Sequence, residues 1–223
     1  CGMKRPRRSN DYYPSPPCAA RAMGEVAGPC RGLRVLDPAG GAGTLLKWSV
    51  PRAEHEVIEI DRLLANEAFR QLRIGTLVHC ANGLELAEPY MRSDVIIANP
   101  PFSLLEAFVR KILGVLKAGV NKRAHILLPT MWLQAAARAD LPEPDLNLLT
   151  WRPQFIAEDD ASGPSVTYAI ATWTTATVRK PRKHGRVRRL AKPAVSAVLE
   201  AEYERINQLL VGMPLLGEQA ELF

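Results

Sequence analysis

The residues with the clearest chemical meaning are Asn99, Pro100, Pro101 and Phe102, which directly follow a short aliphatic run. Two consecutive prolines fix the backbone and remove two amide donors, so nearby carbonyls remain available as acceptors. The side-chain oxygen of Asn99 and the carbonyl of Pro100 can together accept both hydrogens of an amino group, and Phe102 offers a face for stacking a planar base. The alternative is a plain turn that ends a strand, with a phenylalanine in the core. We interpret these residues as a site for an amino nitrogen.

A second candidate is the glycine-rich segment from Asp37 to Thr44, which lies between a predicted strand and a predicted helix. Glycines turn tightly and let a ligand approach the backbone, while the first turn of the helix presents amides that lack partners. A nucleotide-like ligand is expected at such a loop. A tight strand-to-helix turn with no ligand would use the same glycines.

An acid, Glu59, ends the next predicted strand, where it can accept hydrogen bonds from ribose hydroxyls. The alternative is a strand-end charge that faces water. A dinucleotide enzyme stays possible, although the glycine loop lacks the GxGxxG spacing. No Walker lysine follows the glycines, which disfavours a nucleoside triphosphate.

Five short runs rich in β-branched or aliphatic residues have the length and flanks of strands. They are Leu33–Leu36, Glu56–Ile60, Thr76–His79, Asp94–Ala98 and His125–Leu128. Between them, Leu63–Leu72 and Leu104–Leu116 carry apolar residues three and four positions apart, which predicts amphipathic helices. The alternation of strand and helix indicates a parallel sheet with right-handed crossovers and helices on both faces.

The pattern changes after residue 129. Pro129 to Pro164 is rich in prolines, acids and tryptophans and has weak periodicity. Val166–Thr174 predicts a strand that pairs with Gln154–Ile156 in a hairpin, and Ala194–Leu210 predicts an amphipathic helix. The predicted fold class is therefore α/β: a Rossmann-like, doubly wound, mostly parallel seven-stranded sheet with an antiparallel edge hairpin.

Composition and charge restrict the class of protein. The chain has 223 residues, of which 47% are hydrophobic and 23% charged, as in a globular protein of one domain with extensions. No apolar run approaches the roughly 18 residues of a membrane helix, and the N-terminus lacks the apolar stretch of a secretory signal. We therefore expect no membrane partner and a cytoplasmic location. The four cysteines are scattered without CxxC spacing, so we expect no metal site.

Positive charge gathers in two blocks, Lys4–Arg8 and Arg179–Arg189. Such blocks are either solvated tails or arms that bind phosphates. The net charge of +6 and the isoelectric point of about 9.3 favour the arm. The candidate nucleic-acid contacts are Arg182, Lys183, Arg186, Arg188 and Arg189.

Together these motifs resemble the amino-methyltransferases of the class I S-adenosylmethionine-dependent family, particularly the N6-adenine DNA methyltransferases of phages and restriction systems. The resemblance covers about residues 11 to 175. In that family a motif ending in Asp/Asn-Pro-Pro-Tyr/Phe holds the target amine, and Asn99 to Phe102 match it in full. The resemblance implies S-adenosylmethionine as cofactor and DNA as partner, in the cytoplasm of a bacterium or a phage-infected cell.

The resemblance also implies roles for residues outside this motif. Glu59 matches the ribose-binding acid, Ile60 the residue that lies against the cofactor adenine, and Phe155 a second stacking residue. Tyr13 and Ser15 lie in a segment that resembles the one closing over the methionine end, with Ser15 where threonine is more usual. The residues that match the cofactor loop are Asp37, Pro38, Ala39, Gly40, Gly41 and Gly43.

One position departs from the family pattern. Asn82 stands where an acid usually binds the amine of the cofactor adenine. Its carbonyl oxygen can still accept that hydrogen bond, so we expect weaker cofactor binding and not its loss.

The sequence divides into a basic arm with the cofactor-closing segment (1–27), a catalytic domain (28–178) and a basic linker with a C-terminal helix (179–223). No separate recognition domain fits, so we expect a relaxed or short sequence preference, with Pro129 to Pro164 approaching the DNA. Three alternatives stay open: an RNA methyltransferase acting on guanine N2 or adenine, a protein-glutamine methyltransferase, and a catalytically silent nucleic-acid-binding subunit. The oligomeric state cannot be predicted from the sequence.

Overall fold

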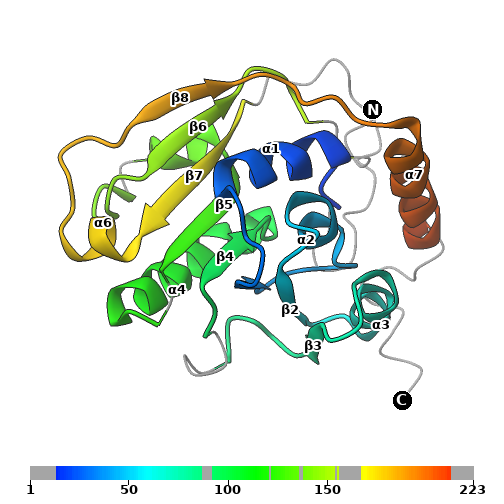
Figure 1. Ribbon diagram of the computed structural model, residues 1–223. Coiled ribbons are helices and arrows are strands. Elements are labelled where there is room, and N and C mark those ends of the chain that lie inside the picture. The colour runs from blue at the N-terminus through cyan, green and yellow to red at the C-terminus, as the bar shows by residue number, and fades with distance from the viewer. Residues whose placement is uncertain are drawn as a thin grey trace, which may run out of the picture.

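A computed structural model of the chain (Figure 1) describes residues 14–86, 92–120, 122–135, 138–153, 155 and 167–211. Strands and helices alternate through its first half, as the sequence predicts. The helices and strands are α1 (Pro17–Ala27), β1 (Arg34–Asp37), α2 (Thr44–Ser49), β2 (Glu54–Glu59), α3 (Arg62–Gln71), β3 (Leu77–Cys80), β4 (Val95–Ala98), the 3-10 helix η3 (Phe102–Leu104), α4 (Leu105–Ala118), β5 (Arg123–Pro129), α5 (Thr130–Leu133), β6 (Asp145–Leu149), β7 (Tyr168–Thr174), α6 (Thr175–Arg179), β8 (Val187–Leu190) and α7 (Ala197–Val211).

The strands form one sheet in the order β3-β2-β1-β4-β5-β7-β6-β8. Strand β7 runs antiparallel to both of its neighbours, and all other pairs are parallel. The mostly parallel α/β class is therefore confirmed, but the sheet has eight strands and not seven. The additional strand, β8, lies within the predicted basic linker. An edge strand pairs on one side only and tolerates charged side chains, so its sequence resembles that of a solvated arm.

The antiparallel part of the sheet is confirmed, but its predicted partner strand was wrong. Strand β7 pairs with β6, with Asp145 opposite Thr172 and Leu148 opposite Ala169. Gln154 and Ile156 lie outside the described residues. Strand β6 has only five residues and is flanked by prolines, so its alternation is too short to predict a strand. Part of the segment from 129 to 164 therefore belongs to the sheet.

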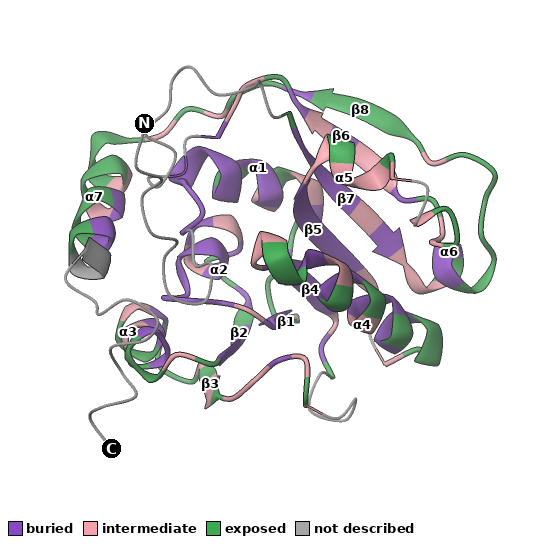
Figure 2. Ribbon diagram, turned by 180° about the vertical axis from the view of Figure 1, so that it is seen from behind, coloured by how far each residue is buried: buried purple, intermediate pink, exposed green. Residues whose placement is uncertain are grey.

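Helices cover both faces of the sheet (Figures 1 and 2). On one face, α1, α2, α3 and α7 pack against a cluster that includes Val35, Val57 and Ile97. On the other face, α4 and α6 pack against a second cluster that includes Leu36 and Ile96. Strands β1, β4 and β5 are buried between these layers, whereas β8 is largely exposed (Figure 2). The buried central strands form a rigid base for the loops at their carboxyl ends.

The predicted domain boundary at residue 178 remains a prediction, but both C-terminal elements pack against the preceding part of the fold, β8 in the sheet and α7 on helices α1 and α2. Strand β8 pairs with β6, and Tyr203 and Ile206 of α7 belong to the core cluster under α1 and α2. No helix among the described residues has the length and apolar character needed to cross a membrane. Within the same residues, no group of three or more His, Cys, Asp or Glu side chains is arranged to hold a metal ion.

Candidate functional site

The glycine loop after β1 lies over the end of β2. The Gly40 amide donates to the carbonyl of Ile58 at 3.0 Å, and a β-carbon on Gly40 would lie 2.6 Å from Cγ1 of Val57. Gly41 and Gly43 have φ values of 53° and 78°, a left-handed conformation that side chains with a β-carbon adopt at a cost. The loop then leads into α2 with Gly43 as its N-cap. The glycines therefore permit both the turn and the close approach of loop to strand.

Two carboxylates lie beside this loop, on neighbouring parallel strands. Glu59 accepts from the amides of Gly41 and Asp61, each at 2.8 Å, and so ties the glycine loop to the end of β2. Burial raises the pKa of Glu59, and the amides of Asp61 and Gly41 partly oppose that shift. Because each carboxylate oxygen has a second lone pair, Glu59 can still accept from a hydroxyl. The neighbouring Ile60 is 53% exposed, so it is accessible to a planar ligand.

The second carboxylate belongs to Asp37, which is buried and accepts from the amide of Ala39 at 3.1 Å. Burial raises the pKa of Asp37 to about 7, and the nearby charge of Glu59 adds to the shift. Between about pH 4 and about pH 7, the unfolded chain therefore loses a proton that the folded protein keeps. The free energy of unfolding must fall as the pH rises through this window.

The variant Asp37→Asn tests this linkage, because an amide retains the acceptor for Ala39 but does not titrate. We expect the variant to become more stable relative to the wild type as the pH rises from about 4 to about 7, by on the order of a few kcal/mol. Urea unfolding across this range measures the difference. Exposed Glu54, changed to Gln, is the control and is expected to leave the profile unchanged. Parallel profiles for Asp37→Asn and the wild type would show that Asp37 is charged throughout.

Asn82 stabilises the turn after β3. Its side-chain oxygen accepts from the Leu84 amide at 3.0 Å, and its nitrogen donates to Glu85 at 2.8 Å. The next residue, Gly83, lies so close to the glycine loop that a β-carbon would be 2.1 Å from the carbonyl oxygen of Pro38. The turn after β3 therefore packs directly on the loop after β1. The sequence contains Gly83 but gives no sign of this contact.

The four residues after β4 stand at the same edge of the sheet, next to the glycine loop. Strand β4 is the parallel neighbour of β1, so Asn99, directly after β4, and Asp37, the last residue of β1, lie at adjacent carboxyl ends. The Asn99 side-chain nitrogen donates to Oγ of Ser15 at 3.0 Å, across 84 positions of sequence. The structure thus brings Ser15 to the turn formed by Asn99, Pro100, Pro101 and Phe102, which we call the corner. Tyr13 lies outside the described residues.

An aromatic cluster borders the corner. Phe102 meets Phe155 edge to face, with ring centroids 6.2 Å apart, and lies 6.1 Å from Tyr168. Phe155 is only 2% exposed and Tyr168 only 1%. Phe155 therefore supports Phe102 in this structure, and it is not presented as a free stacking surface. Tyr168 was not predicted as a site residue, because in the sequence it is simply the first aromatic residue of a strand.

The five predicted phosphate-binding residues are spread out along the direction of strand β8. Arg182 and Lys183 precede β8, near the edge opposite Asn99, whereas Arg188 and Arg189 lie within the strand. Arg182 approaches Asp145 at 3.7 Å, and Arg188 donates to the Asn147 side chain at 3.1 Å. All five, including Arg186, are exposed. They form a basic strip along the outer strand and not a cluster at the corner.

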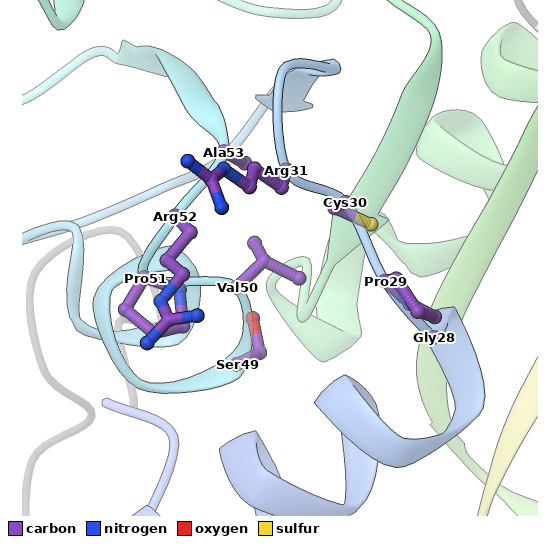
Figure 3. Close-up of a pocket in the computed structure, with 9 residues that line it drawn as sticks. All are labelled: Gly28, Pro29, Cys30, Arg31, Ser49, Val50, Pro51, Arg52 and Ala53. Carbon is purple, nitrogen blue, oxygen red and sulfur yellow. The ribbon is translucent and has the colours of Figure 1, made fainter.

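A cavity of about 360 Å³ opens at the other edge of the sheet (Figure 3). The α1–β1 and α2–β2 loops form it, and Arg31, Ser49 and Arg52 contribute its polar atoms. These loops precede β1 and β2, whereas Asp37 and Glu59 end those strands and Asn99 directly follows β4. The cavity is therefore separate from the candidate site.

No protein-family model and no curated protein sequence matches the chain. Several solved structures are similar in fold. A protein from Listeria monocytogenes assigned as a class I S-adenosylmethionine-dependent methyltransferase has a TM-score of 0.59 and 16% identity, over 94% of this chain and 75% of that one. The 23S rRNA methyltransferase ErmE has a TM-score of 0.53 and 19% identity, over 87% and 77%.

The chain has the class I methyltransferase fold. The type I restriction-modification methyltransferase subunit from Streptococcus thermophilus shares it, with a TM-score of 0.56 and 14% identity over 89% of this chain. The match covers 53% of that subunit, so this chain spans about half of its length. Within the methyltransferase fold, Asp37, Glu59 and Asn99 all lie at the carboxyl edge of the parallel strands, where open α/β sheets bind ligands.

Proposed function

We propose that this protein is an S-adenosylmethionine-dependent methyltransferase that methylates an exocyclic amino group of a nucleic-acid base, with N6 of adenine in DNA as the principal substrate. The observation that carries the proposal is the position of Asn99, Pro100, Pro101 and Phe102. They follow β4, directly beside the glycine loop after β1, in a fold shared with known methyltransferases. An amine held by Asn99 would therefore face a ligand held by that loop.

The residues at the glycine loop fit the proposed cofactor. Gly40 to Gly43 leave the loop backbone without bulky side chains, and Glu59 can accept from ribose hydroxyls. Exposed Ile60 would lie against the adenine ring. The Asn82 oxygen already accepts from Leu84, so it would have to share its second lone pair with the cofactor amine. This sharing is consistent with the weaker binding expected from the sequence.

When bound, S-adenosylmethionine would supply a methyl group on a positively charged sulfur. The chain's own part is to hold the amine. Asn99 and the Pro100 carbonyl would accept its two hydrogens and favour a pyramidal nitrogen whose lone pair points at the methyl carbon. Transfer of that methyl group to the nitrogen would release one amine hydrogen to solvent as a proton. Positioning and fixed dipoles would provide the rate.

A base in a duplex cannot reach this corner without leaving the helix, at a cost of a few kcal/mol. Stacking on Phe102, which Phe155 and Tyr168 support from behind, would offset part of that cost. Phosphate contacts along β8 would offset more. Strand β8 lies four strand positions from β4, about 19 Å away. That separation corresponds to about six base steps, so the basic strip would bind backbone flanking the extruded base.

RNA is the second candidate substrate, because one structure with the same fold is a methyltransferase of 23S rRNA. Transfer of labelled methyl from S-adenosylmethionine to DNA, RNA and free nucleosides, followed by mass analysis of the modified base, distinguishes the two. N6-methyladenine in DNA supports the proposal, and label found only in RNA redirects it to RNA. No transfer to any of the three, despite cofactor binding by calorimetry, would favour a silent binding subunit.

A further inference from the structure

We propose that Ser15 is a positioning residue that orients the Asn99 side chain, and that Tyr203 of the C-terminal helix holds Ser15 in place. The proposal rests on the proposed function, because the orientation of Asn99 matters only if Asn99 binds an amine. It assigns a role to α7, which follows the predicted catalytic domain.

An asparagine side chain ends in an oxygen and a nitrogen of similar size but opposite hydrogen-bonding character. Only the oxygen can accept from an amino group, and a flipped Asn99 would present donors to donors. The Asn99 nitrogen lies 3.0 Å from Ser15 Oγ, which serves as its acceptor. Because this contact engages the nitrogen end, the oxygen points to the other side of the planar amide. In this structure Ser15 therefore holds Asn99 in the orientation that an amine substrate requires.

The segment that carries Ser15 is fixed in turn. Pro14, Ser15 and Pro16 are all buried, and the two prolines restrict the backbone on either side of Ser15. The Tyr203 hydroxyl donates to the Pro14 carbonyl at 3.3 Å. Tyr203 is 5% exposed, and its ring meets Trp48 edge-on with centroids 6.2 Å apart. Tyr203 thus links the residue before Ser15 to α2, the helix that the glycine loop begins.

A neighbouring residue fixes α7 on the same helix. Glu202 accepts from the Lys47 ammonium group and, at 3.3 Å, from Nε1 of Trp48. Lys47 and Trp48 belong to α2, which starts directly after Gly43. Helix α7 therefore contacts both the Ser15 segment and the element after the glycine loop. Helix α7 would thus fix the position of the amine-binding part of the proposed site relative to the glycine loop.

A double-mutant cycle tests the link between Ser15 and Asn99. We expect Ser15→Ala to lower the methyl-transfer rate about tenfold and Ser15→Thr to restore it, because threonine keeps the hydroxyl. In the Asn99→Ala background, Ser15→Ala should change the residual rate by less than about twofold, since coupled residues are not additive. A full tenfold loss in that background would show that Ser15 acts on the cofactor or the fold, and would overturn the proposal.

Tyr203→Phe keeps the ring and removes only the hydroxyl. It should lower the rate about threefold in the wild type and not at all in Ser15→Ala. Glu204→Gln, on the exposed side of α7, is the matched control and should match the wild type. If Tyr203→Phe lowers the rate by the same factor in both backgrounds, Tyr203 does not act through Ser15, and its proposed role is wrong.

A readout independent of activity is the NMR signal of the Asn99 side-chain amide, assigned by its loss in Asn99→Ala. Ser15→Ala should shift or broaden this signal, Ser15→Thr should largely restore it, and Glu204→Gln should leave it in place. An unchanged signal in Ser15→Ala would overturn the positioning role whatever the rates. If the signal responds but the wild type methylates no substrate, the contact is supported and the proposed function fails.

Discussion

Replacing Asn99 by alanine is expected to lower the rate of methyl transfer about 10²- to 10³-fold, the loss typical of removing one preorganised polar group from a transition state. Alanine cannot accept a hydrogen of the target amine, and the Pro100 carbonyl alone cannot hold both. Cofactor binding should persist, because the 2.8 Å bond that holds the glycine loop to Glu59 does not involve Asn99. Single-turnover transfer and calorimetric titration measure the two quantities.

The matched control is Ser103→Ala, four residues further on in η3, where the side chain is exposed. It should retain the wild-type rate. The result that contradicts the assignment is an Asn99→Ala variant that transfers methyl groups at more than about a tenth of the wild-type rate. In that case the amine would be held elsewhere, and the corner would be the plain strand-ending turn considered for the sequence.

The sequence predicts the central half of the fold and the edge of the sheet at which the candidate site residues lie. Short aliphatic runs such as Asp94–Ala98 are recognisable because the strands they form, here β4, are buried on both faces. Residues that end or directly follow such runs meet at one edge of a parallel sheet, as Asp37, Glu59 and Asn99 do here. The local sequence pattern is sufficient to predict this edge where each strand carries a candidate residue at its carboxyl end.

The antiparallel half of the sheet was harder to predict. Strand β6 is five residues long, and β8 carries arginines whose side chains face solvent. These two strands form because neighbouring strands provide hydrogen-bond partners for their backbone, and their own sequences favour a strand only weakly. Their pairing therefore depends on tertiary contacts such as that between Asn147 and Arg188.

Side-chain contacts between distant segments were also beyond the sequence. Ser15 could be assigned to a segment by resemblance, but nothing in the sequence indicates that its hydroxyl meets Asn99. Likewise, the apolar stripe of the C-terminal helix predicts that Tyr203 is buried, but not that its hydroxyl reaches Pro14. Phe155 was assigned to base stacking by resemblance, but nothing in the sequence indicates that its ring is buried edge to face against Phe102. Each of these contacts depends on how separate elements dock.

The second large effect is expected for Gly83→Ala. A β-carbon at this position would lie 2.1 Å from the Pro38 carbonyl oxygen and 3.3 Å from the Phe108 ring. The closest atom is backbone, so it cannot rotate away, and the turn after β3 must separate from the glycine loop. We expect a loss of about 1–3 kcal/mol in the free energy of unfolding, typical of overpacking. Cofactor affinity should also fall, because the displaced loop is the one that would bind it.

Gly114→Ala is the matched comparison, because it adds the same methyl group where nothing lies within 4 Å. Gly114 is exposed within α4, so alanine there should stabilise the protein by up to about 1 kcal/mol through helix propensity. Urea unfolding and calorimetric titration of both variants measure the contrast. Both substitutions add one methyl group, so a loss in Gly83→Ala that exceeds the helix-propensity gain of Gly114→Ala reports the contact between Gly83 and Pro38. Equal stability and equal affinity in the two variants would mean that the turn can move without disturbing the loop, and would contradict this prediction.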